Sequence, residues 1–245
     1  MLRGIYSAAS GMVFEQQTVD IIANNLANLN TTGYKRKEPV AASFKDVLVE
    51  LMDQTPGTGD TIGTGVHIGQ IAQDPTQGNL RQTNGPLDVA IADPGQYFVT
   101  QRSDGTNLIT RDGEFYRNAA GDIVTSTGDN LLADNGQPIA VGSDIQNIKI
   151  REDGTITQNG NAIGKIMVVA PSQADLAQFP RLVTPLPPVA STNLRQGYLE
   201  ASNVNAVTEM VSLLEASKLF NLEQKVVSAH DQLLQKSTQE IGKTS

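Results

Sequence analysis

The chain has 245 residues, a formal net charge of −8 and no cysteine. The lack of cysteine excludes disulfide bonds and thiolate metal sites, and the acidic balance argues against a nucleic-acid binder, which usually presents a basic face. We therefore expect no nucleic-acid partner. No apolar run reaches the ~18 residues that a membrane-spanning helix needs, so we expect no membrane span either.

The N-terminal stretch, roughly residues 3–29, is expected to be a helix. Its apolar stripe contains Ile5, Met12, Val19, Ile22 and Leu26. All of these except Ile22 recur every seven positions, and such a heptad repeat predicts a helix with one apolar seam. The run 28–33 (NLNTTG) is rich in turn-forming residues, so the helix should end there.

Two further features of the N-terminal part bear on location. The basic cluster Lys35–Lys37 is expected to be a solvated loop. Residues 1–12 lack the apolar core of a cleaved signal peptide, so we expect the protein either to stay in the cytoplasm or to leave it by a route that needs no such peptide.

The middle of the chain, roughly residues 34–200, is expected to be β structure. Short runs that suit strands, at 87–92, 97–101, 145–151 and 164–170, alternate with turn signals. The turn signals are Asp104-Gly105, Asp112-Gly113, Gly121-Asp122, Gly128-Asp129, Asn135-Gly136, Asp153-Gly154 and Asn159-Gly160. Such dense pairs predict hairpins, and their regular spacing predicts an antiparallel sandwich or barrel-like domain.

The last part, roughly residues 206–238, shows the clearest helical pattern. Its heptad residues are Leu213, Phe220, Val227 and Leu234, and the stripe is widened by Val207, Met210, Leu214 and Val226. Asn205 is expected to cap the start, and Glu209 suits the positive end of the helix dipole. A helix with one apolar stripe needs cover, so each end of the chain should pack against the other end or against another copy.

These patterns together predict a mixed α+β chain. Long terminal helices that form a coiled-coil-like layer are expected to flank a central antiparallel all-β domain. The expected divisions are an N-terminal assembly helix (1–33), a connecting arm (34–79), the central β domain (80–200) and a C-terminal assembly helix (201–245). Within the arm, the Gly- and Thr-rich run 55–69 is expected to be a connector.

Six runs along the chain carry a resemblance to a known family. They are 4–12 (GIYSAASGM), 22–28 (IANNLAN), 30–35 (NTTGYK), 86–91 (PLDVAI), 110–115 (TRDGEF) and 196–205 (QGYLEASNVN). In this order the chain resembles the flagellar rod, hook and filament axial proteins, and above all the basal-body rod branch.

The resemblance implies a structural subunit of the hollow rod that transmits torque and passes exported subunits. In that family the terminal helices line a tube beneath an outer β layer. The implied partners are copies of the chain, other rod subunits and the flagellar type III export apparatus. The implied location is the basal body across the periplasm, reached without a cleaved signal peptide. Asn25 and Asn28 are expected to combine hydrogen bonds between subunits with ending the first helix.

No grouping in the sequence indicates catalysis or a metal. Asp88, Arg111 and Asp112 could suggest an acid pair, but a hairpin turn with a local ion pair is the preferred interpretation. His67 and His230 lack the spacing of metal ligands, and His230 is expected at the edge of the apolar seam. We therefore expect no enzyme activity and no catalytic, cofactor-binding or metal-binding residue.

Alternatives to this interpretation remain open. A wall hydrolase on a β scaffold would need paired carboxylates or a Ser-His-Asp set in a rigid cleft, and a trimeric coiled-coil surface protein would need longer unbroken heptads. Within the family, the compact length and the runs 164–169 (GKIMVV) and 220–227 (FNLEQKVV) resemble the proximal rod branch. The runs 62–66 (IGTGV) and 77–80 (QGNL) resemble the distal branch, so a distal or hook-type subunit is the alternative to the preferred proximal one.

Overall fold

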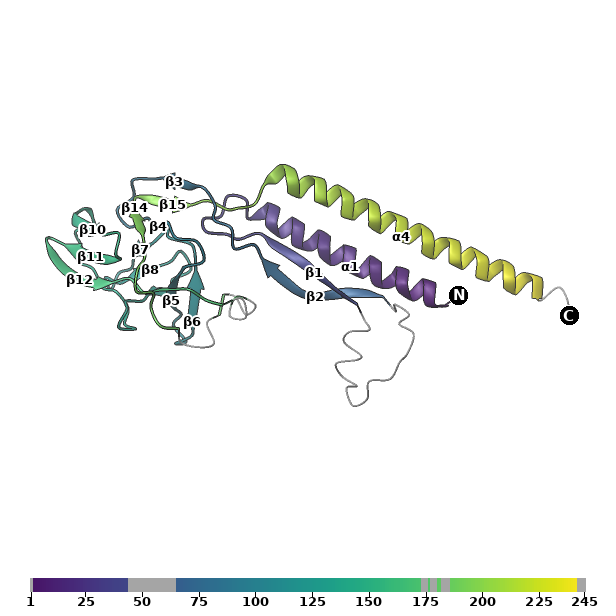
Figure 1. Ribbon diagram of the computed structural model, residues 1–245, viewed down its shortest axis with the longest axis horizontal. Coiled ribbons are helices and arrows are strands. Elements are labelled where there is room, and N and C mark those ends of the chain that lie inside the picture. The colour runs from purple at the N-terminus through teal and green to yellow at the C-terminus, as the bar shows by residue number, and fades with distance from the viewer. Residues whose placement is uncertain (1, 44–64, 173–175, 177–179, 182–185, 242–245) are drawn as a thin grey trace. The chain divides into compact units, whose positions relative to one another are not determined.

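Figure 1 shows the computed structural model of the chain. It describes all residues except 1, 44–64, 173–175, 177–179, 182–185 and 242–245. The chain divides into two compact units. The helical unit comprises Met1–Ala27, Lys37–Ala72 and Asn205–Ser245, and the β-rich unit comprises Asn28–Arg36 and Gln73–Val204.

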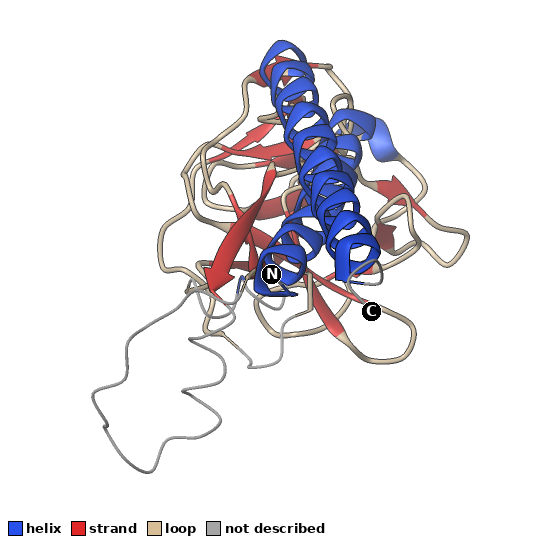
Figure 2. Cartoon of the chain, turned by 90° about the vertical axis from the view of Figure 1, so that its right-hand side faces the viewer, coloured by secondary structure: helices blue, strands red, loops and turns tan. Residues whose placement is uncertain are grey.

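Two long helices dominate the helical unit. They are α1 (Leu2–Ala27) and α4 (Ala206–Ile241), and they lie side by side in both views (Figures 1 and 2). Strands β1 (Lys37–Ser43) and β2 (Val66–Gln73) pair with each other, and β1 packs against α1. The heptad patterns predicted helices over about 3–29 and 206–238, and both are confirmed.

Local hydrogen bonds explain where the helices begin and end. The side-chain oxygen of Asn205 accepts hydrogen bonds from the backbone N–H groups of Val207 (3.0 Å) and Thr208 (3.3 Å), which confirms the predicted cap of α4. Beyond the end of α1, Thr31 donates its backbone N–H to the Asn28 carbonyl at 3.2 Å. The Thr31 hydroxyl also donates to Asn28 Oδ1 at 3.1 Å, so Asn28 takes part in the turn that ends the helix.

The β-rich unit is built from short antiparallel strands. They are β3 (Leu80–Gln82), β4 (Val89–Ile91), β5 (Tyr97–Gln101), β6 (Asn107–Thr110), β7 (Tyr116–Arg117), β8 (Ile123–Val124), β9 (Asn130–Leu131), β10 (Ile148–Ile150), β11 (Thr155–Gln158), β12 (Asn161–Lys165), β13 (Val168–Val169), β14 (Leu194–Gln196) and β15 (Tyr198–Glu200). One sheet runs β13-β5-β9-β8-β7 with β6 beside β5, and a second runs β10-β11-β12. The pairs β14-β4 and β15-β3 complete the set described.

Turn residues close several of these hairpins as predicted. Between β11 and β12, Asn159 and Gly160 have φ angles of 52° and 84°. A two-residue hairpin turn of this kind needs positive φ at both positions, which Asn and Gly tolerate best. The Asn-Gly signal at this position is therefore confirmed.

Three sequence expectations need correction. The run 145–151 is not one strand, because it opens with the 3-10 turn η1 (Ile145–Asn147) before β10. The run 164–170 is also split, since β12 ends at Lys165 and β13 pairs separately with β5. The connector expected at 55–69 lies largely outside the described residues, and its end from Val66 is strand β2.

Apolar side chains of the β-rich unit form its core. The main cluster contains Leu87, Val89, Ile91, Phe98, Phe115, Ile123, Leu131, Ala133, Ile139, Val141, Ile148, Ile150, Ile156, Ile166, Val168 and Leu194. The rings of Phe98 and Phe115 meet edge to face at 5.3 Å, a favourable aromatic geometry. Along the sequence, an N-terminal and a C-terminal helix thus flank a β-rich region of antiparallel sheets. The coiled-coil-like layer, the sandwich or barrel form and the domain boundaries remain predictions.

Candidate assembly site on the terminal helices

The helices α1 and α4 pack antiparallel in one consistent register. A Cβ atom placed on Gly4 would lie 2.9 Å from Nε2 of His230, and one on Gly11 would lie 2.1 Å from Oε1 of Glu223. Near the other end, Asn25 donates a side-chain hydrogen bond to Glu209. These contacts are seven and fourteen residues apart on both helices, so a single register relates them. Two of the three α1 positions are glycines, which allow the α4 side chain to approach the backbone.

Asn25 links three elements of the helical unit. Its Nδ2 donates to Glu209 Oε2 at 3.0 Å and to the Lys37 carbonyl at 2.9 Å, and its Oδ1 accepts from the Lys37 N–H at 3.0 Å. Asn25 is 1% exposed and Glu209 is fully buried. Asn25 therefore fixes the start of β1 and the first turn of α4 against α1 within one chain.

The predicted interface residues fall into three groups by exposure. Ile22 and Asn25 are buried, whereas Ile5, Met12, Val19, Leu26, Asn28, Leu213, Phe220, Val227 and Leu234 are half-buried. Val207 and Met210 are exposed, at 72% and 52%. His230, which was expected at the edge of the apolar seam, is half-buried with its ring against Gly4 of α1.

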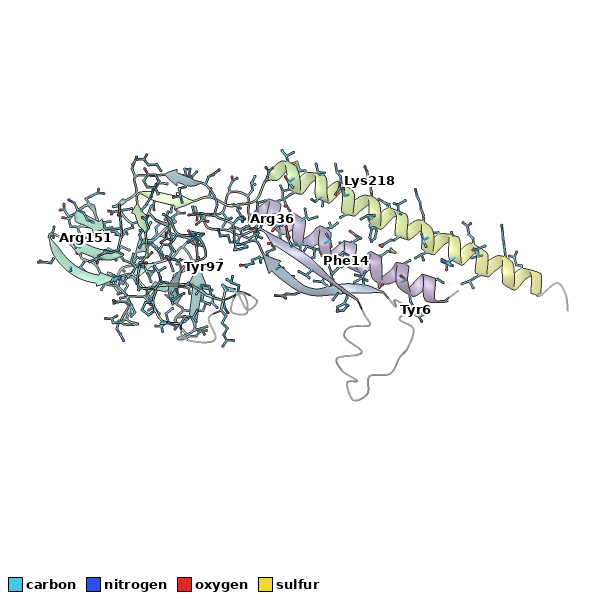
Figure 3. All side chains as sticks on the ribbon, in the orientation of Figure 1. Tyr6, Phe14, Arg36, Tyr97, Arg151 and Lys218 are labelled. Carbon is cyan, nitrogen blue, oxygen red and sulfur yellow. The ribbon has the colours of Figure 1, made fainter. Side chains whose placement is uncertain are left out.

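A second apolar surface lies on α4. Its large exposed side chains are Val207, Met210, Val211, Leu214, Leu219, Leu222, Val226 and Leu233, and we call this set the outer face. Figure 3 shows many α4 side chains projecting into open space around the helix, with Lys218 labelled among them. Solvent-exposed apolar patches of this kind mark interaction surfaces in soluble proteins.

A buried ion cluster forms inside the β-rich unit. Lys35 Nζ donates to Glu200 Oε1 at 2.6 Å and to the Thr76 carbonyl at 2.6 Å. Arg111 Nε lies 3.0 Å from Glu200 Oε2, and the three side chains are at most 2% exposed. The backbone N–H of Gly78 donates to Glu200 Oε1 at 3.0 Å. One carboxylate thus holds two cations and one backbone donor.

Burial shifts the ionisation of this cluster. Loss of water around the ammonium lowers the pKa of Lys35, and the Glu200 carboxylate counteracts part of that shift. Loss of water also lowers the pKa of Arg111, again opposed by Glu200. The guanidinium lies 5.8 Å from the centre of the Tyr97 ring, a cation–π distance. Tyr97 is labelled among the packed side chains of this unit in Figure 3.

Two sequence interpretations are wrong at this cluster. Lys35 was expected in a solvated loop, but it is 4% exposed and paired with Glu200. Arg111 was expected to form a local ion pair in a hairpin turn, but its partner is distant in sequence. Asp112 instead accepts the Thr32 hydroxyl at 2.6 Å, and burial raises the pKa of its carboxyl. Charge pairs between distant segments leave no periodic signal, so sequence patterns could not reveal them.

Residues 32–35 lie directly after α1 in the sequence and are fixed in the β-rich unit. Gly33 donates its N–H to the Glu200 carbonyl at 2.8 Å and has a φ angle of 66°. A Cβ atom at Gly33 would lie 2.3 Å from the Arg111 carbonyl carbon, so only glycine fits there. Glu200 itself lies shortly before α4 in the sequence. The β-rich unit therefore holds both segments that lead to the terminal helices.

The described part of the chain has few features of other kinds of site. Outside the residues left undescribed, no three His, Asp or Glu side chains gather in a way that could hold a metal ion. Among the described helices, none combines the length and apolar character needed to cross a membrane. The contacts of the described residues are those of packing and anchoring.

Terminal helices that pack together and keep further apolar side chains exposed are typical of proteins that bind other protein subunits. Comparison with known families agrees with this class. Residues 5–35 match the family described as "Flagella basal body rod protein", residues 90–158 match "Flagellar hook protein FlgE/F/G D1 domain", and residues 195–240 match "Flagellar basal body rod FlgEFG protein C-terminal".

Full-length relatives point the same way. The chain is 34% identical over 261 positions to the flagellar basal-body rod protein FlgG of Agrobacterium fabrum, covering 95% of this chain and 97% of the relative. It is 31% identical to FlgG of Bacillus subtilis, with 96% and 97% covered, and 29% identical to the rod protein FlgF of Caulobacter vibrioides, with 99% of both covered. The chain belongs to the flagellar basal-body rod protein family, whose members are structural subunits of the rod.

Proposed function

We propose that this rod subunit assembles with copies of itself and with other rod subunits through the outer face of α4. The observation that carries the proposal is the exposure of this face. Leu214 is 62% exposed and Leu222 is 55% exposed, although the opposite side of α4 packs on α1. Burying each such side chain in a neighbour would contribute roughly 1.5–3 kcal/mol.

In this proposal the seam between α1 and α4 holds the helix pair together and does not bind neighbouring subunits. Leu213, Phe220, Val227 and Leu234 pack towards α1 of the same chain and set the shape of the helix pair. Ile5, Met12, Val19, Ile22 and Leu26 supply the matching side of α1, and Asn25 ties it to α4. Val207 and Met210, which also belong to the predicted interface, lie on the outer face and would contact neighbours directly. The pair would act as one layer of a coiled-coil-like wall.

The family and the sequence support the rest of the proposed role. The subunit would be passed out of the cell by the flagellar export apparatus, without cleavage of its N-terminal segment, and would build the hollow shaft across the periplasm. Its compact length supports the proximal rather than the distal part of the rod.

We also propose that the subunit has no catalytic turnover. Support comes from the structural character of the family and from the described acids themselves. Asp88 accepts a hydrogen bond from the hydroxyl of Thr83, and Asp112 accepts one from Thr32, so both carboxylates are engaged in local structure. Purified protein should therefore leave peptidoglycan intact. Solubilised wall fragments that disappear in Asp88→Asn or Asp112→Asn would contradict this.

The assembly proposal is tested by charging the outer face. Leu222→Glu places a carboxylate among the exposed apolar side chains, whereas the control Gln224→Glu adds the same charge at an exposed polar position of the same helix. We expect Leu222→Glu to abolish rods and swimming while the purified chain keeps its helical circular dichroism. Gln224→Glu should swim. Normal swimming of the Leu222→Glu strain would refute the proposed interface.

A further inference from the structure

Two acidic side chains, Glu15 of α1 and Glu223 of α4, lie half-buried on the helix pair and are near enough for the charge of Glu15 to act on Glu223. Glu223 of α4 lies against the backbone of Gly11, close enough that an added Cβ would meet its carboxylate. Its Oε2 atom is buried and has no hydrogen-bond partner. Glu15 lies one helical turn after Gly11 on the same face of α1 and is half-buried. The neighbouring seam residues are apolar, including Met12 and Val227.

The other ionisable groups of the helical unit are less suited to neutralise this pair. Along α4, Glu209 and His230 face the seam at two heptads and one heptad from Glu223. Lys218 and Lys225 of the same helix are exposed. From the strands packed on α1, β1 carries the half-buried Lys37 and the exposed Glu38, and β2 carries His67. Among the described salt bridges, none involves Glu15 or Glu223.

We propose that Glu15 and Glu223 form a proton-controlled latch, in which closure of the α1–α4 pair takes up a proton and loss of that proton drives the helices apart. This device concerns the free chain and does not depend on the outer-face assembly proposed above. It gives a role to the acid that lies opposite Gly11 in the seam. Gly11 leaves space for the Glu223 carboxyl, and closure of the helix pair then depends on whether that carboxyl is protonated.

The direction of the effect follows from the environment. Burial raises the pKa of Glu15, and burial together with the nearby Glu15 charge raises the pKa of Glu223. A carboxyl whose pKa is higher in the closed pair than in the open chain binds protons more tightly when the pair is closed. It therefore favours closure at pH values below its ordinary pKa of about 4.3, and this contribution is lost as the pH rises through the higher pKa of the closed state.

The latch is tested by urea unfolding of the helical signal of the full chain between about pH 4 and pH 8. Four chains are compared: the unmodified chain, Glu15→Gln, Glu223→Gln and the double variant. Glu215→Gln serves as control, because Glu215 is an exposed acid on α4. The double-variant cycle isolates the interaction between the two acids from the contributions of all other ionisable groups.

We expect the closed fraction of the unmodified chain to fall several-fold towards pH 8 relative to Glu223→Gln, because a shift of one pKa unit corresponds to about a tenfold change in the closure equilibrium. The unfavourable coupling between Glu15 and Glu223 should appear at pH 8 and vanish near pH 4. Glu215→Gln should follow the unmodified chain at every pH. Equal pH profiles for the unmodified chain and Glu223→Gln, or a complete lack of helical signal in both at every pH, would overturn the latch.

Discussion

Asn25 donates its side-chain amide to Glu209 at 3.0 Å, and this bond joins the last turns of α1 to the first turn of α4. Both side chains are almost completely buried. A buried carboxylate is costly unless donors surround it, so the pair specifies one register in a seam that apolar contacts alone would define loosely. Such use of a buried polar residue to fix helix register is well attested.

Replacement of Asn25 should therefore destabilise the helical unit. Asn25→Ala removes a donor to Glu209 and both hydrogen bonds to Lys37, and bonds to charged groups contribute about 1.5–3 kcal/mol each. We expect a loss of about 3 kcal/mol in urea unfolding followed at 222 nm. Gln17→Ala, at an exposed position of α1, should stay within about 0.5 kcal/mol. A loss no larger than that of the control would show that the pair does not hold the register.

Removal of the Glu200 charge should destabilise the β-rich unit. Glu200→Gln keeps the shape of the side chain but leaves Lys35 and Arg111 buried without their shared counter-charge. Breaking a buried ion pair in this way costs about 3–5 kcal/mol. The measurement is unfolding followed by the near-ultraviolet signal of the tyrosines, since the chain has no tryptophan.

The matched control for that variant is Glu152→Gln, which removes an exposed carboxylate of the same unit. It should change stability by less than about 0.5 kcal/mol. If Glu200→Gln were as stable as Glu152→Gln, the cluster would contribute no net stability. The double variant Lys35→Met with Glu200→Gln tests whether the stability lost in Glu200→Gln comes from leaving a buried cation unpaired. In that case the double variant should be more stable than Glu200→Gln alone.

The sequence predicted those parts of the structure that depend on local pattern. The heptads placed both helices within a few residues, Asn205 was identified as a cap, and run 97–101 coincides with β5. The same heptads also selected the seam residues Phe220 and Val227, although a helical repeat cannot tell whether a seam is covered by its own chain or by another copy.

The parts that the sequence did not reveal depend on contacts between distant segments. Lys35 belongs to a basic run that is typical of a solvated loop. The residues near it in the sequence do not indicate that it will be buried in an ion pair with Glu200. The outer face was only partly predicted, through Val207, Met210, Leu214 and Val226, because a second apolar stripe on a long helix blurs the period of the first. The position of Glu223 in the seam was not predicted either, because an acidic residue on a long helix is normally exposed to solvent.

Gly33 gives a prediction about the segment that follows α1. Gly33→Ala would place a Cβ against the Arg111 backbone and keep a φ of 66° that L-residues adopt at a cost of about 1–2 kcal/mol. The clash adds roughly 1–3 kcal/mol. Gly95→Ala is the control, because Gly95 has a φ of 73° and open space around it, so it loses only the backbone contribution. Equal losses in the two variants would show that the close approach at Gly33 is not required.

Hydrogen exchange should show that the two ends of the helix pair differ in stability. The buried side chains of the pair, among the residues described, gather towards the end of α1 and the first half of α4, as Ile22, Asn25, Glu209 and Ala216. Towards Leu234 the side chains of α4 are at best half-buried, and the outer face has no cover in the free chain. Since helices in proteins are stabilised mainly by packing of their apolar face, amides should exchange slowly around Ala216 and progressively faster towards Leu234. Amides of the central strand β5 should exchange more slowly than those at either end of α4, because the β5 side chains from Tyr97 to Thr100 are buried.

Incorporation of the chain into rods should then slow exchange most at the Leu234 end, where neighbouring subunits supply the missing packing. Uniform slow exchange along the whole of α4 in the free chain would mean that the helix pair is already complete before assembly.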